Sequence, residues 1–439
     1  MKIQILFAGA AAAVTAGALL FGGVRGSEPA ETVARVSAVP EGTLAQLLDG
    51  LAAGDTGGYV RRLERRVAAA PADADGRILL GLAYQQRARE TGDPDFFMRS
   101  ERMLLQARTL APREPVVLTG LAALASTRHR FETAIGLSRK ALAYDPENAV
   151  AFGVLGDSFV ELGRYDEAFE AYDRMAELAP GLSSYARVAH ARELLGRPGE
   201  AIEAIELGLE YQTLSEHSAW GFVQIGNLEL GRGRLEVAGR FFRRALARYP
   251  GYVHALGGLA EIERARGNYE RAIERLQVVV ERLPVPEYAT RLGDSLAAAG
   301  RTEQAMAAYG LVASLERRLA ASGVRTELET ALFDLNRDRD YANALVRARR
   351  AFEARPGLEA EHVLAWALYK NGRCEEAQRH SISALRLGTR DLDALYHRSL
   401  IESCLGNRVA AESLLERVKA IDPYYVRNAP SQARIGQEA

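Results

Sequence analysis

The chain has 439 residues, of which 48% are hydrophobic, and its 56 basic and 57 acidic residues give a formal net charge of −1. The charges are scattered without a long block of either sign, which argues against the basic footprint of a nucleic-acid-binding protein. Length alone predicts two or three globular domains with enough apolar residues for a sizeable core.

The first 26 residues differ in kind from the rest. Met1 and Lys2 precede an apolar run from Ile3 to Phe21, and a polar segment without cysteine follows it. A short positive start, an apolar stretch and small residues are typical of a secretory signal peptide, and the run is also long enough to span a bilayer. We therefore expect a signal peptide or an N-terminal membrane anchor over residues 1–26, and a linker over 27–41. The expected location is extracytoplasmic, in the periplasm of a bacterium, with or without anchoring in the cytoplasmic membrane by residues 3–21.

Residues 152–180 encode two helices joined by a tight turn. Apolar residues spaced three and four apart indicate one face of a helix, and such stripes occur on both sides of Gly163 until Pro180 ends the pattern. Small residues, Gly156 and Ala168, allow the two helices to approach closely. The first stripe consists of Phe152, Leu155, Gly156 and Phe159, and the second of Tyr165, Ala168, Tyr172 and Met175.

The same unit recurs along the chain at intervals of 33 to 39 residues. The small residue of the second helix recurs as Ala134, Ala168, Ala201, Ala238, Ala272, Ala305, Ala344, Ala377 and Ala411. A helix-turn-helix unit with a period near 34 resembles the tetratricopeptide repeat. The family's order of a large residue, Leu-Gly, an aromatic residue, Ala, an aromatic residue and Pro is matched by Phe152, Leu155, Gly156, Phe159, Ala168, Tyr172 and Pro180.

The resemblance covers residues 42–423 and overrules the expectation of separate globular domains. It implies an all-α fold, a right-handed superhelical solenoid of about ten to eleven helical hairpins. We divide this part into degenerate N-terminal repeats over 42–112, the tetratricopeptide repeat array over 113–423 and a C-terminal tail over 424–439. Residues 88–103 are expected to lengthen one turn, and the long step between residues 306 and 344 predicts an extended helix.

The family binds peptides or partner proteins in a concave groove, which one face of the first helix of each repeat lines. The groove is therefore expected to be acidic in its middle and aromatic in its C-terminal third, with an exposed pocket around Trp366, Tyr369 and Tyr396. The competing interpretation is that Trp366 lies between helices and that the acids form a solvated face. Carried over by repeat position, the partner-binding residues are Asp157, His190, Asn227, Glu261, Asp294, Asn336, His362, Trp366, Tyr369 and Tyr396.

The two cysteines, Cys374 and Cys404, fall at the start of one second helix and the end of the next first helix. In stacked hairpins these places share one edge of the solenoid, so one interpretation is that an exported chain has a disulfide that joins the last two repeats. Two free thiols in the core are the alternative. The sequence has no C-x-x-C motif, so redox catalysis and thiolate zinc sites have no support.

No catalytic motif interrupts the repeats. The seven histidines form no H-E-x-x-H, and G-x-S-x-G and P-loop motifs are absent. His190 and Glu193 lie one turn apart, but a solvated pair is the commoner explanation than a metal site. We therefore expect no enzyme, no metal and no cofactor.

Taken together, these features predict a non-enzymatic scaffold for protein–protein interactions. It would bind a partner protein or an extended peptide in its concave groove, in cell-envelope assembly or secretion, and would not bind nucleic acid. The alternative is a binder of a small molecule or polysaccharide through the C-terminal aromatic groove.

Overall fold

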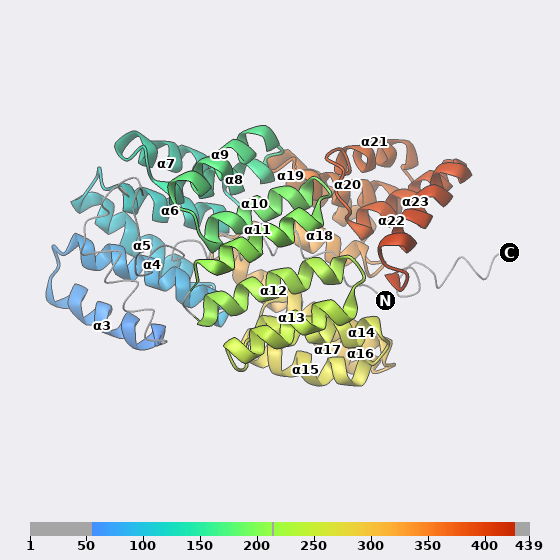
Figure 1. Cartoon of the computed structure of the whole chain (residues 1–439), viewed down its shortest axis with the longest axis horizontal. Helices are drawn as coiled ribbons and strands as arrows, with labels where there is room; N and C mark the ends of the chain where they lie inside the picture. Colours follow the sequence, from blue (N-terminus) through green and yellow to red (C-terminus); the bar gives the residue numbers. More distant parts are fainter. Residues whose placement is uncertain (1–54, 213–214, 426–439) are drawn as a thin grey trace.

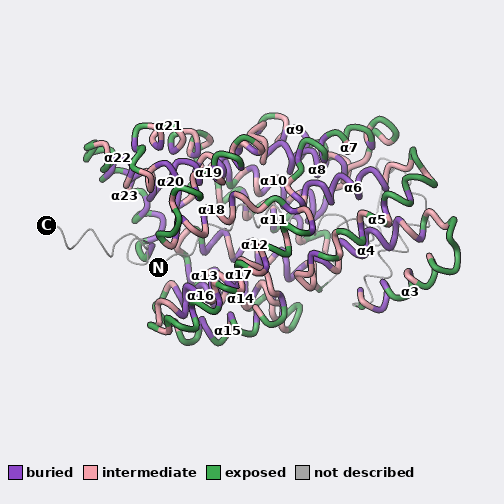
Figure 2. The backbone as a smooth tube through the Cα atoms, turned by 180° about the vertical axis from the view of Figure 1, so that it is seen from behind, coloured by how far each residue is buried: buried purple, intermediate pink, exposed green. Residues whose placement is uncertain are grey.

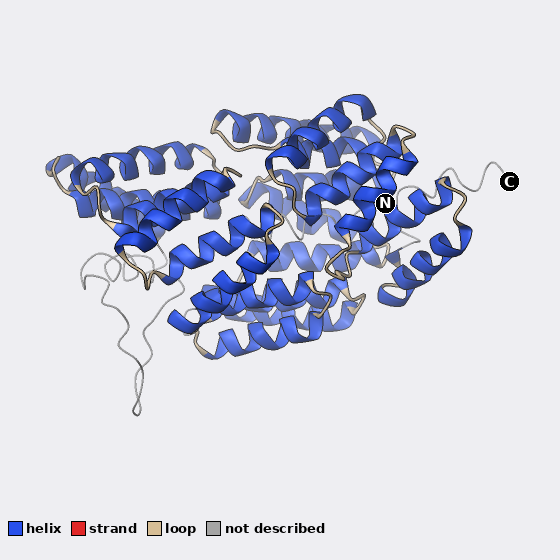
Figure 3. Cartoon of the chain, turned by 90° about the horizontal axis from the view of Figure 1, so that it is seen from above, coloured by secondary structure: helices blue, strands red, loops and turns tan. Residues whose placement is uncertain are grey.

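The protein is an array of antiparallel helical hairpins, as the repeat predicts. This computed structural model describes residues 55–212 and 215–425, and within them it contains 21 helices and no strand (Figure 1, Figure 3). One helix, α3 (Thr56–Ala69), is followed by ten hairpins. Their first helices are α4 (Ala74–Thr91), α6 (Pro115–Thr127), α8 (Ala149–Glu161), α10 (Leu182–Leu194), α12 (Ser215–Gly231), α14 (Val253–Ala265), α16 (Pro286–Ala298), α18 (Glu327–Leu335), α20 (Leu358–Lys370) and α22 (Leu392–Cys404). Their second helices are α5 (Asp95–Leu110), α7 (Phe131–Tyr144), α9 (Tyr165–Leu178), α11 (Pro198–Glu210), α13 (Leu235–Arg248), α15 (Tyr269–Arg282), α17 (Thr302–Ala321), α19 (Tyr341–Ala354), α21 (Cys374–Ala384) and α23 (Arg408–Ile421).

Local sequence signals set the helix ends. Asp73, Asn148 and Asp391 each stand before a first helix and accept a hydrogen bond from a backbone N–H three residues on, which satisfies one of the free donors of the first turn. Most turns within hairpins contain a glycine with positive φ, such as Gly163 at 71°, because the chain reverses there through the left-handed region.

Within a hairpin, a glycine of the first helix receives an aromatic ring of the second. A Cβ atom on Gly156 would lie 2.3 Å from Cε1 of Tyr172, and one on Gly226 would lie 2.5 Å from Cε1 of Phe242. The Gly156 contact is the close approach that the small residues of the repeat predict. Because no side chain larger than hydrogen fits, this pair fixes the distance between the two helices.

The first helices form an inner layer, and the second helices form the outer surface (Figure 1, Figure 2). No residue of α6, α8, α14, α16, α18 or α20 is exposed. In contrast, the outer helix α13 exposes charged residues, among them Glu236, Arg240 and Arg243. A helix that is buried all round lies inside a fold, whereas an amphipathic helix covers its surface.

The solenoid also closes on itself. Four hydrogen bonds or ion pairs join residues 193 to 196 positions apart, including Leu358 N–H to Tyr165 Oη and the pair of Arg355 with Glu161. In an open solenoid each repeat contacts only its neighbours. Here the turns within the hairpins α4–α5 to α12–α13 contact the segments between hairpins in the second half of the chain, so successive superhelical turns touch.

Five turns of the first half make these contacts, and we call them the covered turns: Gly92, His129, Gly163, Gly196 and Gly233. A Cβ on Gly163 would lie 2.7 Å from the carbonyl oxygen of Pro356, and one on Gly196 would lie 2.2 Å from that of Gly388. His129 replaces glycine at φ 56°, and its Nδ1 donates to the carbonyl of Arg325 at 2.7 Å. The segments that they contact are residues 283–285, 323–325, 355–358, 388–390 and 421–422.

Two local expectations have different outcomes. The extended helix is confirmed, since α17 runs for 20 residues. The lengthened turn at 88–103 is wrong, because α4 continues for 18 residues to Thr91 and α5 begins at Asp95. Extra residues there add backbone hydrogen bonds to the helix instead of lengthening the loop.

The expected signal peptide or anchor, the linker and most of the tail lie outside the described residues. Among the described helices, none combines the length and the apolarity needed to cross a membrane.

Candidate partner-binding surface

The predicted groove residues lie on successive inner helices, and most of them contact the next hairpin. Asp157 of α8 is 6% exposed. Both its oxygens accept from Arg187 of α10, at 2.9 and 2.7 Å, and Tyr172 Oη donates to it at 3.0 Å. A bidentate arginine and a phenol saturate this carboxylate, so it links two hairpins within the protein.

Two further predicted groove acids are also buried beside an arginine of the next hairpin. Asp294 accepts from Tyr309 at 2.8 Å and from Arg337 at 2.5 Å. Glu261 lies 3.8 Å from Nε of Arg291, and its pKa is raised by burial, which the charges of Arg264 and Arg291 oppose. The expected acidic channel is therefore wrong, because a buried carboxylate stays in the core only when a cation or donor compensates it.

The C-terminal aromatic residues form a buried stack. Trp366 is 3% exposed, and its ring lies parallel to the imidazole of His397 at 3.6 Å between centroids and to Tyr369 at 5.1 Å. Its Nε1 donates to Asn336 Oδ1 at 3.1 Å. The exposed aromatic pocket is wrong for Trp366 and for Tyr396, also 3% exposed, because side chains of the same and neighbouring hairpins cover both.

The remaining buried candidate, His362, lies beside this stack. Its Nε2 is 2.9 Å from Nδ1 of His397, so one of the two rings donates to the other. Burial lowers the pKa of His362, which keeps the ring neutral in the core. Tyr396 packs edge-on against Tyr425, which donates to Asp393.

Three predicted residues remain partly accessible on the inner side. They are His190, Asn227 and Tyr369, which are all half-buried. His190 lies 3.7 Å from Glu193, whose side chain is 48% exposed. Within the described residues, no group of three or more His, Cys, Asp or Glu side chains is arranged to hold a metal ion.

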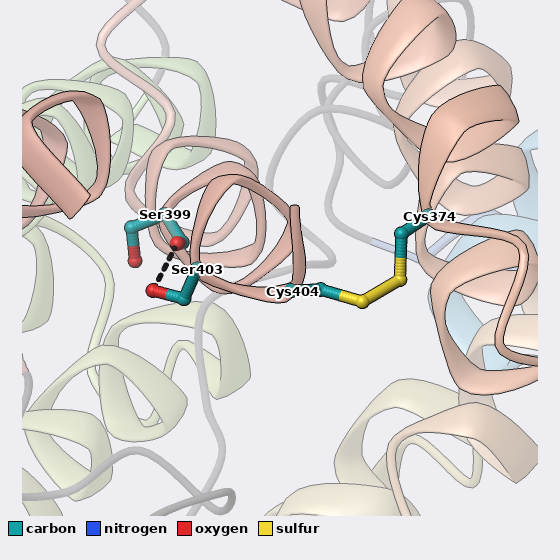
Figure 4. Close-up of a disulfide and its surroundings, with 4 residues drawn as sticks. All are labelled: Cys374, Ser399, Ser403 and Cys404. Carbon is teal, nitrogen blue, oxygen red and sulfur yellow. Dashed lines mark hydrogen bonds between the residues drawn. A yellow bond between two sulfur atoms is a disulfide. The ribbon is translucent and has the colours of Figure 1, made fainter. Parts of the chain in front are cut away.

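The two cysteines are joined in a disulfide that spans the last two hairpins (Figure 4). Cys374 begins α21 and Cys404 ends α22, and their Cα atoms lie 6.3 Å apart. Of the two interpretations that the sequence left open, the structure has the disulfide.

Sequence reasoning missed the arginines that neutralise the inner acids. Arg187 and Arg291 each lie 30 residues after the acid that they pair with, Asp157 and Glu261. That spacing places the arginine on the first helix of the following hairpin, about one helical turn short of the repeat period. A search for opposite charges at this offset would have found both.

Comparison with known proteins identifies the repeats in two segments. Residues 119–183 and 229–290 each match a family model described as a tetratricopeptide repeat. The TPR repeat-containing protein YpiA of Bacillus subtilis (strain 168) is 28% identical over 160 residues, which are 36% of this chain and 37% of YpiA. The match therefore spans little more than a third of that relative.

The solved structures that match are less similar in sequence. A human IFIT1 dimer with m7Gppp-AAAA covers 96% of both chains at 14% identity with a TM-score of 0.46. PilW, described as a widely conserved type IV pilus biogenesis factor, is 21% identical, covers 46% of this chain and 92% of its own, and has a TM-score of 0.37. MamA is 19% identical over 37% of this chain and 93% of its own, with a TM-score of 0.29. The chain thus contains tetratricopeptide repeats, and the part that the structure describes is an all-α array with ten helical hairpins.

Proposed function

We propose that this protein is a non-enzymatic scaffold that binds a partner protein or an extended peptide on its inner face. The observation that supports the proposal is the regular array itself, in which equivalent positions of successive inner helices carry polar or aromatic side chains. His190, Asn227 and Tyr369 are the predicted groove residues that keep accessible surface. A row of equivalent positions at fixed spacing suits an extended ligand that makes many shallow contacts.

The proposed setting is cell-envelope assembly or secretion, outside the cytoplasm. Two features support it: the apolar run from Ile3 to Phe21 and the disulfide between Cys374 and Cys404. Disulfides persist in oxidising compartments and are rare in the cytosol.

The test is affinity capture from cell envelopes with the full chain as bait. The variant carries His190→Ala, Asn227→Ala and Tyr369→Ala, three changes on the inner face that leave the buried arginine pairs intact. The matched control carries Tyr144→Ala and Tyr211→Ala, two exposed outer tyrosines. Helix content measured by circular dichroism verifies that each bait is folded.

A partner that binds wild type and control but not the inner-face variant supports the proposal. Equal capture by all three baits would place binding on another surface, and specific capture by none would remove the scaffold proposal.

A further inference from the structure

The contact between superhelical turns uses only the hairpin turns of the first half of the chain and the junctions of the second half. The second half of the chain has its own turns within hairpins, which we call the uncovered turns: residues 266–268, 299–301, 337–340, 371–373 and 405–408. The glycines at 267, 300, 372 and 406 have positive φ like the covered ones. A Cβ on any of these four would meet no atom of the described residues within 4 Å, and all four are exposed. The turns of the two halves thus share a conformation and differ in what lies against them.

The segments between hairpins show the reverse pattern. In the second half, Pro284 and Pro356 lie under covered turns and are half-buried. In the first half the equivalent prolines, Pro112, Pro146 and Pro180, are exposed. We call the first-half segments the free junctions: residues 70–73, 111–114, 145–148 and 179–181.

The two unused surfaces belong to the first and second halves of the chain, which lie toward opposite ends of the long axis (Figure 1). Covered turns of the first half contact junctions of the second half, so turns point toward the C-terminal end and junctions toward the N-terminal end. The uncovered turns therefore face outward at the C-terminal end of the molecule. The free junctions face outward at its N-terminal end. The turns at the C-terminal end of one molecule thus have the backbone geometry of the covered turns. The junctions at the N-terminal end of the next molecule are equivalent to the segments that the covered turns contact.

Charge matches as well as shape. The uncovered turns carry five arginines with accessible side chains and two exposed aspartates: Arg266, Arg301, Arg339, Arg373, Arg408, Asp338 and Asp340. The sixth arginine, Arg337, is only 9% exposed and is paired with Asp294. The free junctions contain four carboxylates and one arginine: Asp73, Glu114, Asp145, Glu147 and Arg113. A basic end that faces an acidic end favours encounter and sets its polarity.

We propose that the uncovered turns bind the free junctions of a second copy of this chain, so that molecules associate head to tail and continue the superhelix. The intermolecular contact repeats the intramolecular one, a turn of one hairpin against the junction of another. Such an interface uses different patches on the two partners, and it builds an open filament because no rotation closes it. The proposal does not depend on what the inner face binds.

The test uses two variants of the full chain, each with one blocked end. Arg339→Glu with Arg408→Glu reverses charge at the uncovered turns, and Ala72→Arg with Glu147→Arg adds bulk and positive charge at the free junctions. All four positions are exposed. The matched control, Arg243→Glu with Glu206→Arg, changes two exposed charges on the outer helices α13 and α11. Molar mass is measured by sedimentation in detergent solution over a range of concentration and salt.

Head-to-tail association predicts that wild type and control grow beyond dimers with concentration, and less so at high salt because exposed charges are screened. Each blocked variant alone stays at the mass of one chain. An equimolar mixture of the two doubles in mass and grows no further, because it retains one intact pair of ends. Wild type that stays monomeric overturns the proposal, as does self-association of either blocked variant that equals that of wild type.

Discussion

The hydroxyl of Tyr165 accepts a hydrogen bond from the backbone N–H of Leu358, 193 residues further along the chain, at 2.7 Å. The bond is buried, and it joins the start of α9 to the start of α20. Leu358 also belongs to the same apolar cluster as Tyr165 and Phe159. One small core is thus built from two superhelical turns, which makes the stability of the first half depend on the second.

Removing this hydroxyl tests the contact directly. Tyr165→Phe leaves a buried N–H without its acceptor, which costs about 1–3 kcal/mol. We expect a lower midpoint in chemical denaturation, whereas Tyr144→Phe, on an exposed outer tyrosine, leaves it unchanged. An unchanged midpoint for Tyr165→Phe would mean that water reaches Leu358 N–H and that the turns separate there.

Arg355 is the second link between the turns. It is 5% exposed and pairs with Glu329 at 2.6 Å and with Glu161 at 3.3 Å. Arg355→Met strands two carboxylates beside an apolar side chain, so a loss of about 3–5 kcal/mol is expected from thermal or chemical unfolding. Arg174→Met breaks an exposed pair with Glu177 and serves as the control, with an effect of about 0–1 kcal/mol. Comparable losses for both arginines would contradict the buried link.

A carboxyl group beside this link gives the protein a pH dependence. Burial raises the pKa of Glu359 from 4.5 to about 8; Arg355 opposes the rise, and Glu161, Glu329 and Asp391 add to it. Between these two pKa values the folded state holds a proton that the unfolded state has lost, so stability falls as pH rises through this window.

Glu359→Gln keeps the shape of the protonated group and cannot ionise. We expect the variant to gain stability relative to wild type as pH rises from about 4.5 to about 8, with a constant difference above that. Unfolding midpoints of both proteins across this range measure it. Parallel curves for the two proteins would show that Glu359 is ionised in the folded state.

Two glycines separate the cost of backbone strain from the cost of losing the turn-on-turn contact. Gly163 and Gly267 have φ of 71° and 81°, so alanine costs about 1–2 kcal/mol at either position. At Gly163 the new Cβ also meets Pro356 O at 2.7 Å, whereas at Gly267 it meets nothing. Gly163→Ala should therefore destabilise the protein more than Gly267→Ala, by about a further 1–3 kcal/mol in chemical denaturation. Equal losses would indicate that the turns are apart in solution.

Reduction should weaken the C-terminal hairpins. The disulfide closes a loop of 30 residues, for which chain entropy predicts about 3–4 kcal/mol. Adding a reductant should lower the unfolding midpoint of wild type to that of Cys374→Ser with Cys404→Ser, which should not respond to the reductant. A response of the double variant would trace the effect to something other than this bond.

The sequence alone determined the local architecture. The period near 34, the close approach of two helices at Gly156 and the extended α17 could all be predicted, because they depend on side chains within one hairpin or between neighbours. The disulfide could be considered from the sequence for the same reason, since Cys374 and Cys404 lie on adjacent hairpins.

Only the tertiary structure decided that the superhelix closes. Its pitch is the sum of small rotations between hairpins, and no single repeat records that sum. Closure is what pairs Glu161 with Arg355 and covers the turn at Gly163, while it leaves the turns at Gly372 and Gly406 exposed. Repeat positions can therefore name the inner face of this protein, but which turn lies against which junction depends on contacts nearly two hundred residues away.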